Sequence, residues 1–323
     1  MVSRTADVIV IGDGLIGLST ARELAERGAA VVVVGNRRPG AATEASAGLL
    51  IPSWEKLSPA ATPFFADSLD RYPAFVESLR QFDERLVLRS GVVERTGGRY
   101  ALRERDGAVD NVRLLAAVDA ACAASGQIRR THELATSIDV SSADVVRVNC
   151  DGGATLDARH VVLAAGAWSA RIGGLPRALP VRPLKGQMIA LAASPLRQAV
   201  MGEDVYLVPR DSETLVGATV EDVGFDLTVS DDATRSLRAA AARLEPSLSG
   251  AGVSRAWTGL RPATPDLLPI LGRDPDTPRL LYACGHSKNG VLLAPATAAA
   301  LATLCEGANP AVSLEAFSIA RFA

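Results

Sequence analysis

Hydrophobic residues in the first forty positions follow the order strand, glycine turn, helix and strand. Residues 8–11 (VIVI) form an unbroken apolar run, as expected for a parallel strand that is buried on both faces. The glycine-rich sequence GDGLIG follows at 12–17, and an amphipathic helix then runs to Gly28. A second apolar run occupies residues 29–34. This order predicts one βαβ unit.

The three glycines of the 12–17 turn have separate physical roles in such a unit. Gly12 allows the sharp turn, Gly14 lets a pyrophosphate approach the backbone, and Gly17 lets the helix pack against the strand. The first helical residues, Leu15 and Ile16, offer free backbone N–H groups to an anion. The unit is therefore predicted to bind a dinucleotide.

The end of the second strand departs from the usual dinucleotide pattern. An acidic side chain normally stands there and binds the ribose hydroxyls, whereas this chain has Gly35. Asn36 could take over part of that contact. Arg37 and Arg38 could instead bind a 2′-phosphate, so these residues alone leave an NADP enzyme open.

Apolar periodicity predicts the elements of the remaining chain. Helical spacing predicts four further helices, at 64–82, 111–124, 231–244 and 291–304. Apolar runs and alternation predict strands at 127–140, 144–149, 154–163 and 280–284. A β-hairpin is expected at 86–101 with its turn at Gly97-Gly98. The long β-rich segments after Pro180 predict a second, antiparallel sheet.

Two later stretches repeat the order of buried strand, glycine turn and helix. One runs from Leu163 through Gly166 to a short helix near Trp168, and the other runs through the turn at 285–290. Three such junctions suggest one extended cofactor that crosses the sheet. The small-residue stretch at 41–53 either leaves room for that ligand or is an ordinary loop.

Composition and charge exclude several classes of protein. The 323-residue chain has a formal net charge of -2, which provides no electrostatic footprint for nucleic acid or an anionic membrane. Its four cysteines show no CxxC spacing, so we expect reduced, buried thiols and no metal site. The apolar N-terminus is too short and too glycine-broken to span a bilayer. A soluble, cytoplasmic protein is therefore expected.

Seven motifs, in the family's order, resemble the D-amino acid oxidase and glycine oxidase family of FAD enzymes, and most closely the glycine oxidases of thiamine biosynthesis. The motifs are DVIVIGDGLIGLSTARELAERG, ATEASAGLLIP, VVLAAGAWS, PVRPLKGQM, YLVPRDSETLVGATVEDVGFD, WTGLRPATPDLLPILG and GHSKNGVLLAPATA. The resemblance implies an α/β (α+β) fold, in which an antiparallel-sheet substrate domain is inserted into a Rossmann-like FAD-binding domain. It also implies FAD in place of NADP.

The resemblance implies the domain boundaries and the cofactor contacts. Residues 1–50, 104–175 and 256–323 are expected to form the FAD-binding domain, and residues 51–103 and 176–255 the substrate-binding domain. Backbone amides near the start of the last helix are expected to face the flavin end that becomes negative on reduction. The expected cofactor-binding residues are Gly12, Gly14, Leu15, Ile16, Gly17, Asn36, Arg37, Ala45, Ser46, Ala47, Gly48, Leu49, Gly166, Trp168, Arg261, Asn289, Gly290, Val291 and Leu292. Gly259 stands where sarcosine oxidase relatives carry the flavin-linked cysteine, so non-covalent FAD is expected.

The resemblance also implies the substrate contacts. Arg261 matches the arginine that holds the substrate carboxylate, which a guanidinium can bind through two parallel hydrogen bonds. Tyr206 matches the tyrosine that binds the same carboxylate. Lys288 replaces an arginine beside the substrate, and Val220 stands in the pocket wall. From the residues alone, Arg261 could equally belong to a structural ion pair.

The implied activity is the FAD-dependent oxidative deamination of glycine, sarcosine or small D-amino acids. Hydride transfer to flavin N5 would give an oxo acid, ammonia or an amine, and, with molecular oxygen, hydrogen peroxide. Three alternatives are an oxidase or dehydrogenase of N-substituted glycines or other secondary amines, a dehydrogenase with a quinone or protein acceptor, and a non-enzymatic flavin protein. Relatives form dimers or tetramers, so we expect a homo-oligomer.

Overall fold

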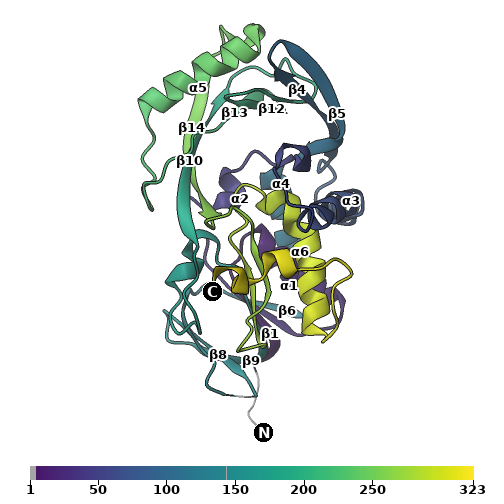
Figure 1. Ribbon diagram of the computed structural model, residues 1–323, viewed down its shortest axis with the longest axis vertical. Helices are drawn as coiled ribbons and strands as arrows, with labels where there is room; N and C mark the ends of the chain where they lie inside the picture. Colours follow the sequence, from purple (N-terminus) through teal and green to yellow (C-terminus); the bar gives the residue numbers. More distant parts are fainter. Residues whose placement is uncertain (1–4, 143) are drawn as a thin grey trace.

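The computed structural model describes residues 5–142 and 144–323, and its strands form two eight-stranded sheets. Figure 1 shows an elongated molecule with the first sheet near the N-terminus and the second, curled sheet at the opposite end. The short helix α2 (Ala42–Ala45) lies between the two sheets. The arrangement confirms the predicted combination of a parallel nucleotide-binding sheet and a separate, mostly antiparallel sheet.

The first sheet contains the predicted βαβ unit. β1 (Ala6–Ile11) pairs in parallel with β2 (Val31–Val34), and α1 (Leu15–Glu26) connects them. β1 also pairs in parallel with β9 (Thr155–Leu163), which makes it a central strand. The strand order is β15-β16-β9-β1-β2-β6, with β8 beside β9 and β7 beside β8. The other strands of this sheet are β6 (Ile128–Thr131), β7 (Ala135–Asp139), β8 (Val146–Cys150), β15 (Ile270–Arg273) and β16 (Leu280–Cys284).

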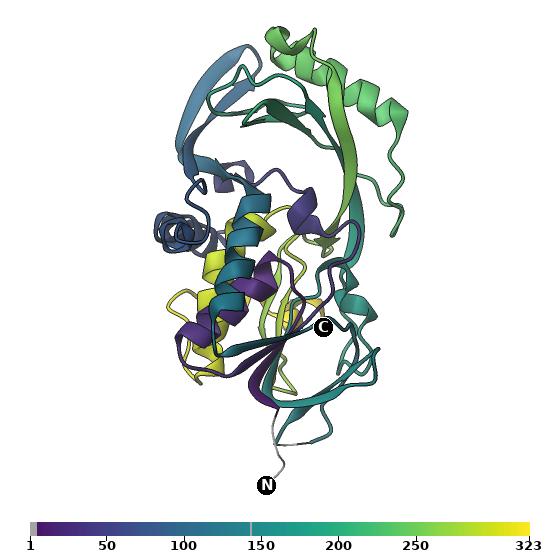
Figure 2. The same ribbon diagram turned by 180° about the vertical axis from the view of Figure 1, so that it is seen from behind.

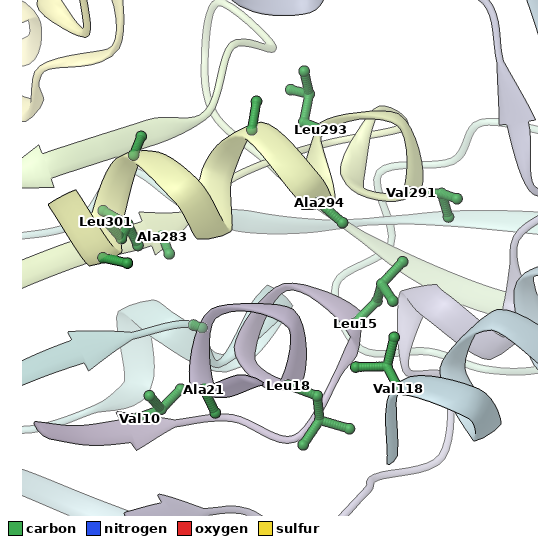
Figure 3. Packing of buried hydrophobic residues seen from close by; sticks show 14 of the residues in the cluster. Val10, Leu15, Leu18, Ala21, Val118, Ala283, Val291, Leu293, Ala294 and Leu301 are labelled. Carbon is green, nitrogen blue, oxygen red and sulfur yellow. The ribbon is translucent and has the colours of Figure 1, made fainter. Parts of the chain in front are cut away.

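Both faces of the central strands are buried, which explains their continuous apolar sequence. Val10 of β1 belongs to the core that α1 and α6 (Gly290–Cys305) cover, whereas its neighbour Ile9 belongs to the core on the opposite face. Figure 3 shows Leu15 of α1 and Ala294 of α6 in the first of these cores. Since successive strand residues point to opposite faces, a strand with a core on each side is apolar throughout.

Further helices lie on the α1 side of the first sheet. Figures 1 and 2 show α4 (Asn111–Ala124) on the same side as α1 and α6. α4 spans the predicted residues because the Asp110 carboxylate accepts hydrogen bonds from the N–H groups of Val112 and Arg113 at its start. α3 (Thr62–Leu79) packs against α6, and these helices extend the core toward the second sheet.

The second sheet has the order β14-β10-β13-β12-β11-β4-β5-β3. Most neighbours are antiparallel, as predicted, but β11 and β4 are parallel. α5 (Asp231–Leu244), whose bounds match the prediction, covers the outer face of this sheet (Figure 1). The strands are β3 (Leu49–Leu50), β4 (Leu88–Thr96), β5 (Arg99–Val109), β10 (Arg182–Leu191), β11 (Ala199–Met201), β12 (Tyr206–Arg210), β13 (Glu213–Gly217) and β14 (Val253–Ala263).

The hairpin of β4 and β5 turns at Gly97 and Gly98 as predicted. Its second strand continues to Val109, beyond the predicted end at residue 101. The polar sequence RERD at 103–106 shows no apolar alternation, so the pattern did not predict a strand there. The strand is exposed up to Arg105 and becomes buried only afterwards. Short 3₁₀ helices complete the fold: η1 (Pro52–Trp54), η2 (Gly166–Arg171), η3 (Pro246–Leu248), η4 (Glu315–Phe317) and η5 (Ile319–Phe322).

Two of the domain boundaries predicted from the sequence fall inside strands. The boundary before residue 104 divides β5, and the boundary before residue 256 divides β14. Each of these strands therefore begins in one proposed unit and ends in the other. The division into an FAD-binding and a substrate-binding unit remains a proposal.

The cysteines and helices bear on two further expectations. All four cysteines are free thiols; Cys122, Cys150 and Cys284 are buried as predicted, whereas Cys305 is only partly buried. Within residues 5–142 and 144–323, every helix is too short or too polar to cross a lipid bilayer.

Candidate functional site

A cavity of about 470 Å³ lies between the two sheets. The first sheet contributes its glycine turns and the starts of α1 and α6, and the second sheet contributes side chains of β10, β12 and β14. The three strand-turn-helix junctions predicted from the sequence therefore meet at one place. Such a convergence at the carboxyl ends of parallel strands is typical of a nucleotide site.

The first glycine turn fits the roles predicted for it. A Cβ atom on Gly12 would lie 2.3 Å from the carbonyl oxygen of Ala164, and one on Gly17 would lie 1.9 Å from the carbonyl oxygen of Gly12. A Cβ on Gly14 would meet only the Thr43 hydroxyl, at 3.5 Å. Gly12 and Gly17 are thus required by the packing of the chain itself, whereas Gly14 leaves space open toward the cavity.

The first turn of α1 is free to bind an anion. Its N-cap residue Gly14 makes no side-chain cap, and no acidic residue stands in its first turn. The Leu15 N–H donates a hydrogen bond to the Thr43 hydroxyl at 3.3 Å, and Leu15 and Ile16 both line the cavity. The other N–H groups of the first turn and the positive end of the helix dipole suit the pyrophosphate of a dinucleotide.

The other two junctions complete the same wall. Gly166 and Trp168 follow β9 and line the cavity. After β16, Ser287 adopts a left-handed backbone with φ of 50°, which helps turn the chain into α6. Asn289, the N-cap residue of α6, makes no side-chain capping hydrogen bond, so the first amides of this helix are also available to a ligand.

The stretch at 41–53 is an ordered part of the site, not an ordinary loop. It contains α2, β3 and the start of η1. The small residues Ala45, Ser46, Ala47 and Gly48, together with Leu49, line the cavity. A Cβ on Gly259 would lie 2.2 Å from the Cβ of Ala45, so the packing leaves no room for a cysteine at position 259. This close approach supports non-covalent cofactor binding.

Of the two arginines that follow β2, Arg37 is already paired with acidic residues. The Arg37 guanidinium lies 2.6 Å from the Asp119 carboxylate and 3.4 Å from that of Glu44. Asn36 lines the cavity beside it, and the Arg38 guanidinium lies 5.4 Å from the centre of the Trp168 ring. Because Arg37 is neutralised by two acids, it is a poor receptor for a 2′-phosphate, which weakens the NADP alternative.

Arg261 and Tyr206 meet at the other end of the cavity, as expected. Arg261 donates hydrogen bonds through Nη1 to the carbonyl oxygens of Thr219 (3.1 Å) and Lys185 (3.4 Å). A Cβ on Gly186 would lie 2.2 Å from that nitrogen, so the glycine makes room for the guanidinium. No carboxylate of the described residues pairs with Arg261, so the structural ion pair that the sequence left open is absent there.

The Tyr206 hydroxyl remains a proton donor in this environment. Burial raises its pKa above the usual 10.0, and the neighbouring Arg261 charge offsets only part of that rise. The hydroxyl donates to the sulfur of Met188 at 3.6 Å, a weak contact. A substrate oxygen is a better acceptor, so the hydroxyl can turn to it.

Lys288 and Val220 also line the cavity, but their surroundings refine the expectations. The Lys288 ammonium lies 3.0 Å from the carboxylate of Glu55, whose side chain is 13% exposed. Val220 is 68% exposed and stands at the mouth. Lys288 is therefore a neutralised cation, in contrast to Arg261.

Gly17 and Leu292 do not line the cavity, whereas the other predicted site residues do. Gly17 packs within the turn, and Leu292 is buried in the core, with its carbonyl accepting a hydrogen bond from Ser68.

His286 lines the cavity as a buried, neutral group. Its Nε2 lies 3.2 Å from the Thr297 hydroxyl, and burial lowers its pKa to about 3. Asp13 and Glu55 were missed by the sequence analysis, although both line the cavity. The position of Asp13 between Gly12 and Gly14 could have predicted that it lines the cavity, whereas no local sequence pattern indicated Glu55.

A family model described as DAO, FAD dependent oxidoreductase, matches residues 7–91 and 84–304 of this chain. The chain is 34% identical to a glycine oxidase of Pseudomonas putida, over 94% of this chain and 96% of that protein. It spans only 55% of the length of the bifunctional protein ThiO/ThiG of Trichormus variabilis, to which it is 32% identical over 98% of this chain.

Two crystal structures have the same fold. The glycine oxidase from Geobacillus kaustophilus superposes with a TM-score of 0.90 at 29% identity, covering 98% of this chain and 99% of that one. The iminodiacetate oxidase from Chelativorans sp. BNC1 superposes with a TM-score of 0.88 at 26% identity, covering 96% and 98%.

Proposed function

We propose that this chain, which belongs to the DAO family of FAD-dependent oxidoreductases, oxidises small amino acids that carry one carboxylate, such as glycine, sarcosine and small D-amino acids. Family membership makes it a flavoenzyme with FAD as cofactor. The observation that carries the proposal is the Arg261 guanidinium, which faces the cavity and has no carboxylate partner among the described residues.

The residues present fit FAD. The Gly14 backbone and the uncapped start of α1 would hold the pyrophosphate, and the small residues 45–49 would lie along the flavin. The amides at the start of α6 would meet the flavin end that becomes negative on reduction. When bound, FAD supplies the chemistry: it accepts a hydride from the substrate carbon and passes two electrons to oxygen, giving hydrogen peroxide.

Arg261 and Tyr206 would orient the substrate through its carboxylate. The guanidinium can offer two parallel donors, and the Tyr206 hydroxyl a third, to the two oxygens. Fixing the carboxylate at one end of a small molecule also fixes its α-carbon, and such positioning lowers the barrier by removing rotational freedom. The substrate must enter with a neutral amine, whose lone pair assists hydride departure; the imine product then hydrolyses to the oxo acid and ammonia or an amine.

The described residues supply no evident general base. His286, the histidine that lines the cavity, contacts Thr297. Glu55 is held by Lys288. Both groups therefore have structural partners. This supports a reaction that depends on orientation and electrostatics rather than on proton abstraction from carbon.

A second candidate is an oxidase or dehydrogenase of N-substituted glycines or other secondary amines. The exposed position of Val220 at the cavity mouth favours it, because a substituent on nitrogen needs space beyond the α-carbon. The structural similarity to an iminodiacetate oxidase also supports it, since iminodiacetate is such an amine.

Anaerobic flavin spectroscopy tests both candidates. The purified holoprotein is mixed with glycine, sarcosine, D-alanine, D-proline and iminodiacetate in turn, and the visible flavin absorbance is followed before and after air is admitted. Bleaching by a small amino acid and recovery with peroxide supports the oxidase proposal. Faster bleaching by secondary amines favours the second candidate, and a bleached spectrum that air does not restore, but an added quinone does, points to another electron acceptor. An oxidised spectrum with every amine contradicts both.

A further inference from the structure

The end of β2 lacks the side chain that usually recognises the adenosine ribose. In dinucleotide folds of this type, an acidic residue about 20 positions after the glycine motif accepts hydrogen bonds from the ribose hydroxyls. Gly35 occupies this place immediately after β2, and it lines the cavity. A glycine offers no side-chain acceptor, so FAD would lose this contact unless another residue supplies it.

The side chain of Asp13 occupies the space that an acid at position 35 would need. A Cβ placed on Gly35 would lie 2.8 Å from both Cβ and Cγ of Asp13, and 2.9 Å from its backbone nitrogen. The two positions therefore compete for one volume. An acidic residue at 35 is incompatible with Asp13 in this conformation, and the glycine at 35 is what allows Asp13 to stand there.

The Asp13 carboxylate is available to a ligand. Its side chain is 12% exposed, and the residue lines the same cavity as Gly35 and Asn36. Within residues 5–142 and 144–323, the Asp13 carboxylate pairs with Arg130, whose Nη2 lies 3.8 Å away, outside hydrogen-bond distance. Arg130 also pairs with Asp119, so it does not fully neutralise Asp13.

We propose that Asp13 binds the adenosine ribose of FAD through its hydroxyl groups, and so replaces the acidic residue missing at the end of β2. Each carboxylate oxygen can accept a hydrogen bond, and the ribose offers two neighbouring hydroxyls as donors. Arg130, which does not line the cavity, supports the charge of Asp13. The same negative charge repels a 2′-phosphate, which selects FAD over phosphorylated dinucleotides.

The inference concerns the cofactor and holds whichever amine is the substrate. It is tested by titrating the apoprotein with FAD and with an FAD analogue that lacks the adenosine 2′-hydroxyl, using flavin fluorescence to obtain Kd. Wild-type protein should prefer FAD over the analogue by about 10-fold, the value of one hydrogen bond to a charged group. Asp13→Ala should weaken FAD binding by roughly 10- to 100-fold and should bind FAD and the analogue equally.

Two further variants separate recognition from structural damage. Asp13→Asn keeps the shape of the side chain and removes its charge, so it should show the same direction of change if Asp13→Ala does not fold. Asp119→Asn removes a charge that pairs with the same Arg130 but does not line the cavity, and it should keep the preference for FAD. The proposal would be overturned if the Asp13 variants kept the wild-type preference for FAD over the analogue, whether or not their affinity for the two ligands fell.

Discussion

The two ends of the cavity are built from different parts of the polypeptide. The cofactor end consists mostly of backbone: three turns, each following a strand of the same sheet, with N-cap residues Gly14 and Asn289 that make no side-chain cap. The Asp13 carboxylate is the side chain that we propose to act there. The substrate end consists of side chains, chiefly Arg261 on β14 and Tyr206 on β12, strands that are not neighbours in their sheet. A site made of backbone is fixed by the fold, whereas a site made of side chains can change with single substitutions.

This difference predicts different consequences for mutations at the two ends. Removing a side-chain group at the substrate end should lower kcat/KM and leave the fold and the cofactor in place. Adding an atom at the cofactor end should instead affect the binding of FAD, because the backbone there approaches the ligand without side chains between them.

The largest effect is expected for Arg261→Met. The variant loses the charged fork that the substrate carboxylate needs, and truncating one partner of a buried charge pair costs about 4 kcal/mol, or roughly 10³-fold in kcat/KM. FAD absorbance per protein and the melting temperature should change little. Steady-state peroxide formation with glycine or sarcosine measures the loss.

Arg261→Lys is the matched control for the geometry of the fork. It keeps the positive charge but can donate only from one nitrogen, so kcat/KM should recover in part, to between the values of wild type and Arg261→Met. Equal activity of the wild-type protein and the methionine variant would contradict the assignment of Arg261 to the substrate carboxylate.

A smaller effect is expected at the cofactor end for Gly14→Ala. Gly14 has φ of -76°, which alanine adopts readily, and its Cβ would be 3.5 Å from the nearest protein atom. The apoprotein should therefore fold normally. FAD affinity should fall by roughly 10- to 100-fold, the cost of an extra methyl group in a close contact. Titration of the apoprotein with FAD measures this.

Gly17→Ala gives the contrast within the same turn. Its Cβ would lie 1.9 Å from the Gly12 carbonyl oxygen, so this variant should lose fold stability with or without FAD. If Gly14→Ala destabilised the apoprotein as much as Gly17→Ala does, the space beside Gly14 would not be a ligand site.

The same contrast explains what the sequence could predict. The cofactor end is local in the chain, because each glycine turn stands directly between its strand and its helix, and helices such as 111–124 were predicted to the residue. The pairing of Arg261 with Tyr206 came from family resemblance, since no local pattern brings β12 and β14 together.

Contacts between distant residues were not predictable. The Glu55 carboxylate pairs with Lys288, and neither position carries a pattern that marks the other. The overlap of Asp13 with the position of a side chain at Gly35 depends on how the first turn approaches the end of β2. The sequence pointed to a missing acid at Gly35 and offered Asn36 for part of its contact, whereas Asp13 was indicated only by the packing.

The smallest of these effects is expected for Tyr206→Phe, which removes one hydroxyl from the substrate end. One hydrogen bond to a charged carboxylate contributes about 1.5 kcal/mol, so kcat/KM should fall roughly 10-fold with FAD binding unchanged. Because burial raises the Tyr206 pKa above 10.0, the hydroxyl should stay protonated up to that pH. The wild-type activity should rise with pH as the substrate amine loses its proton, and the ratio of wild type to Tyr206→Phe should stay constant between pH 6 and pH 10. A ratio that shrinks toward one near pH 10 would mean that Tyr206 ionises at its ordinary pKa, and a ratio of one at every pH would remove the hydroxyl from the substrate site.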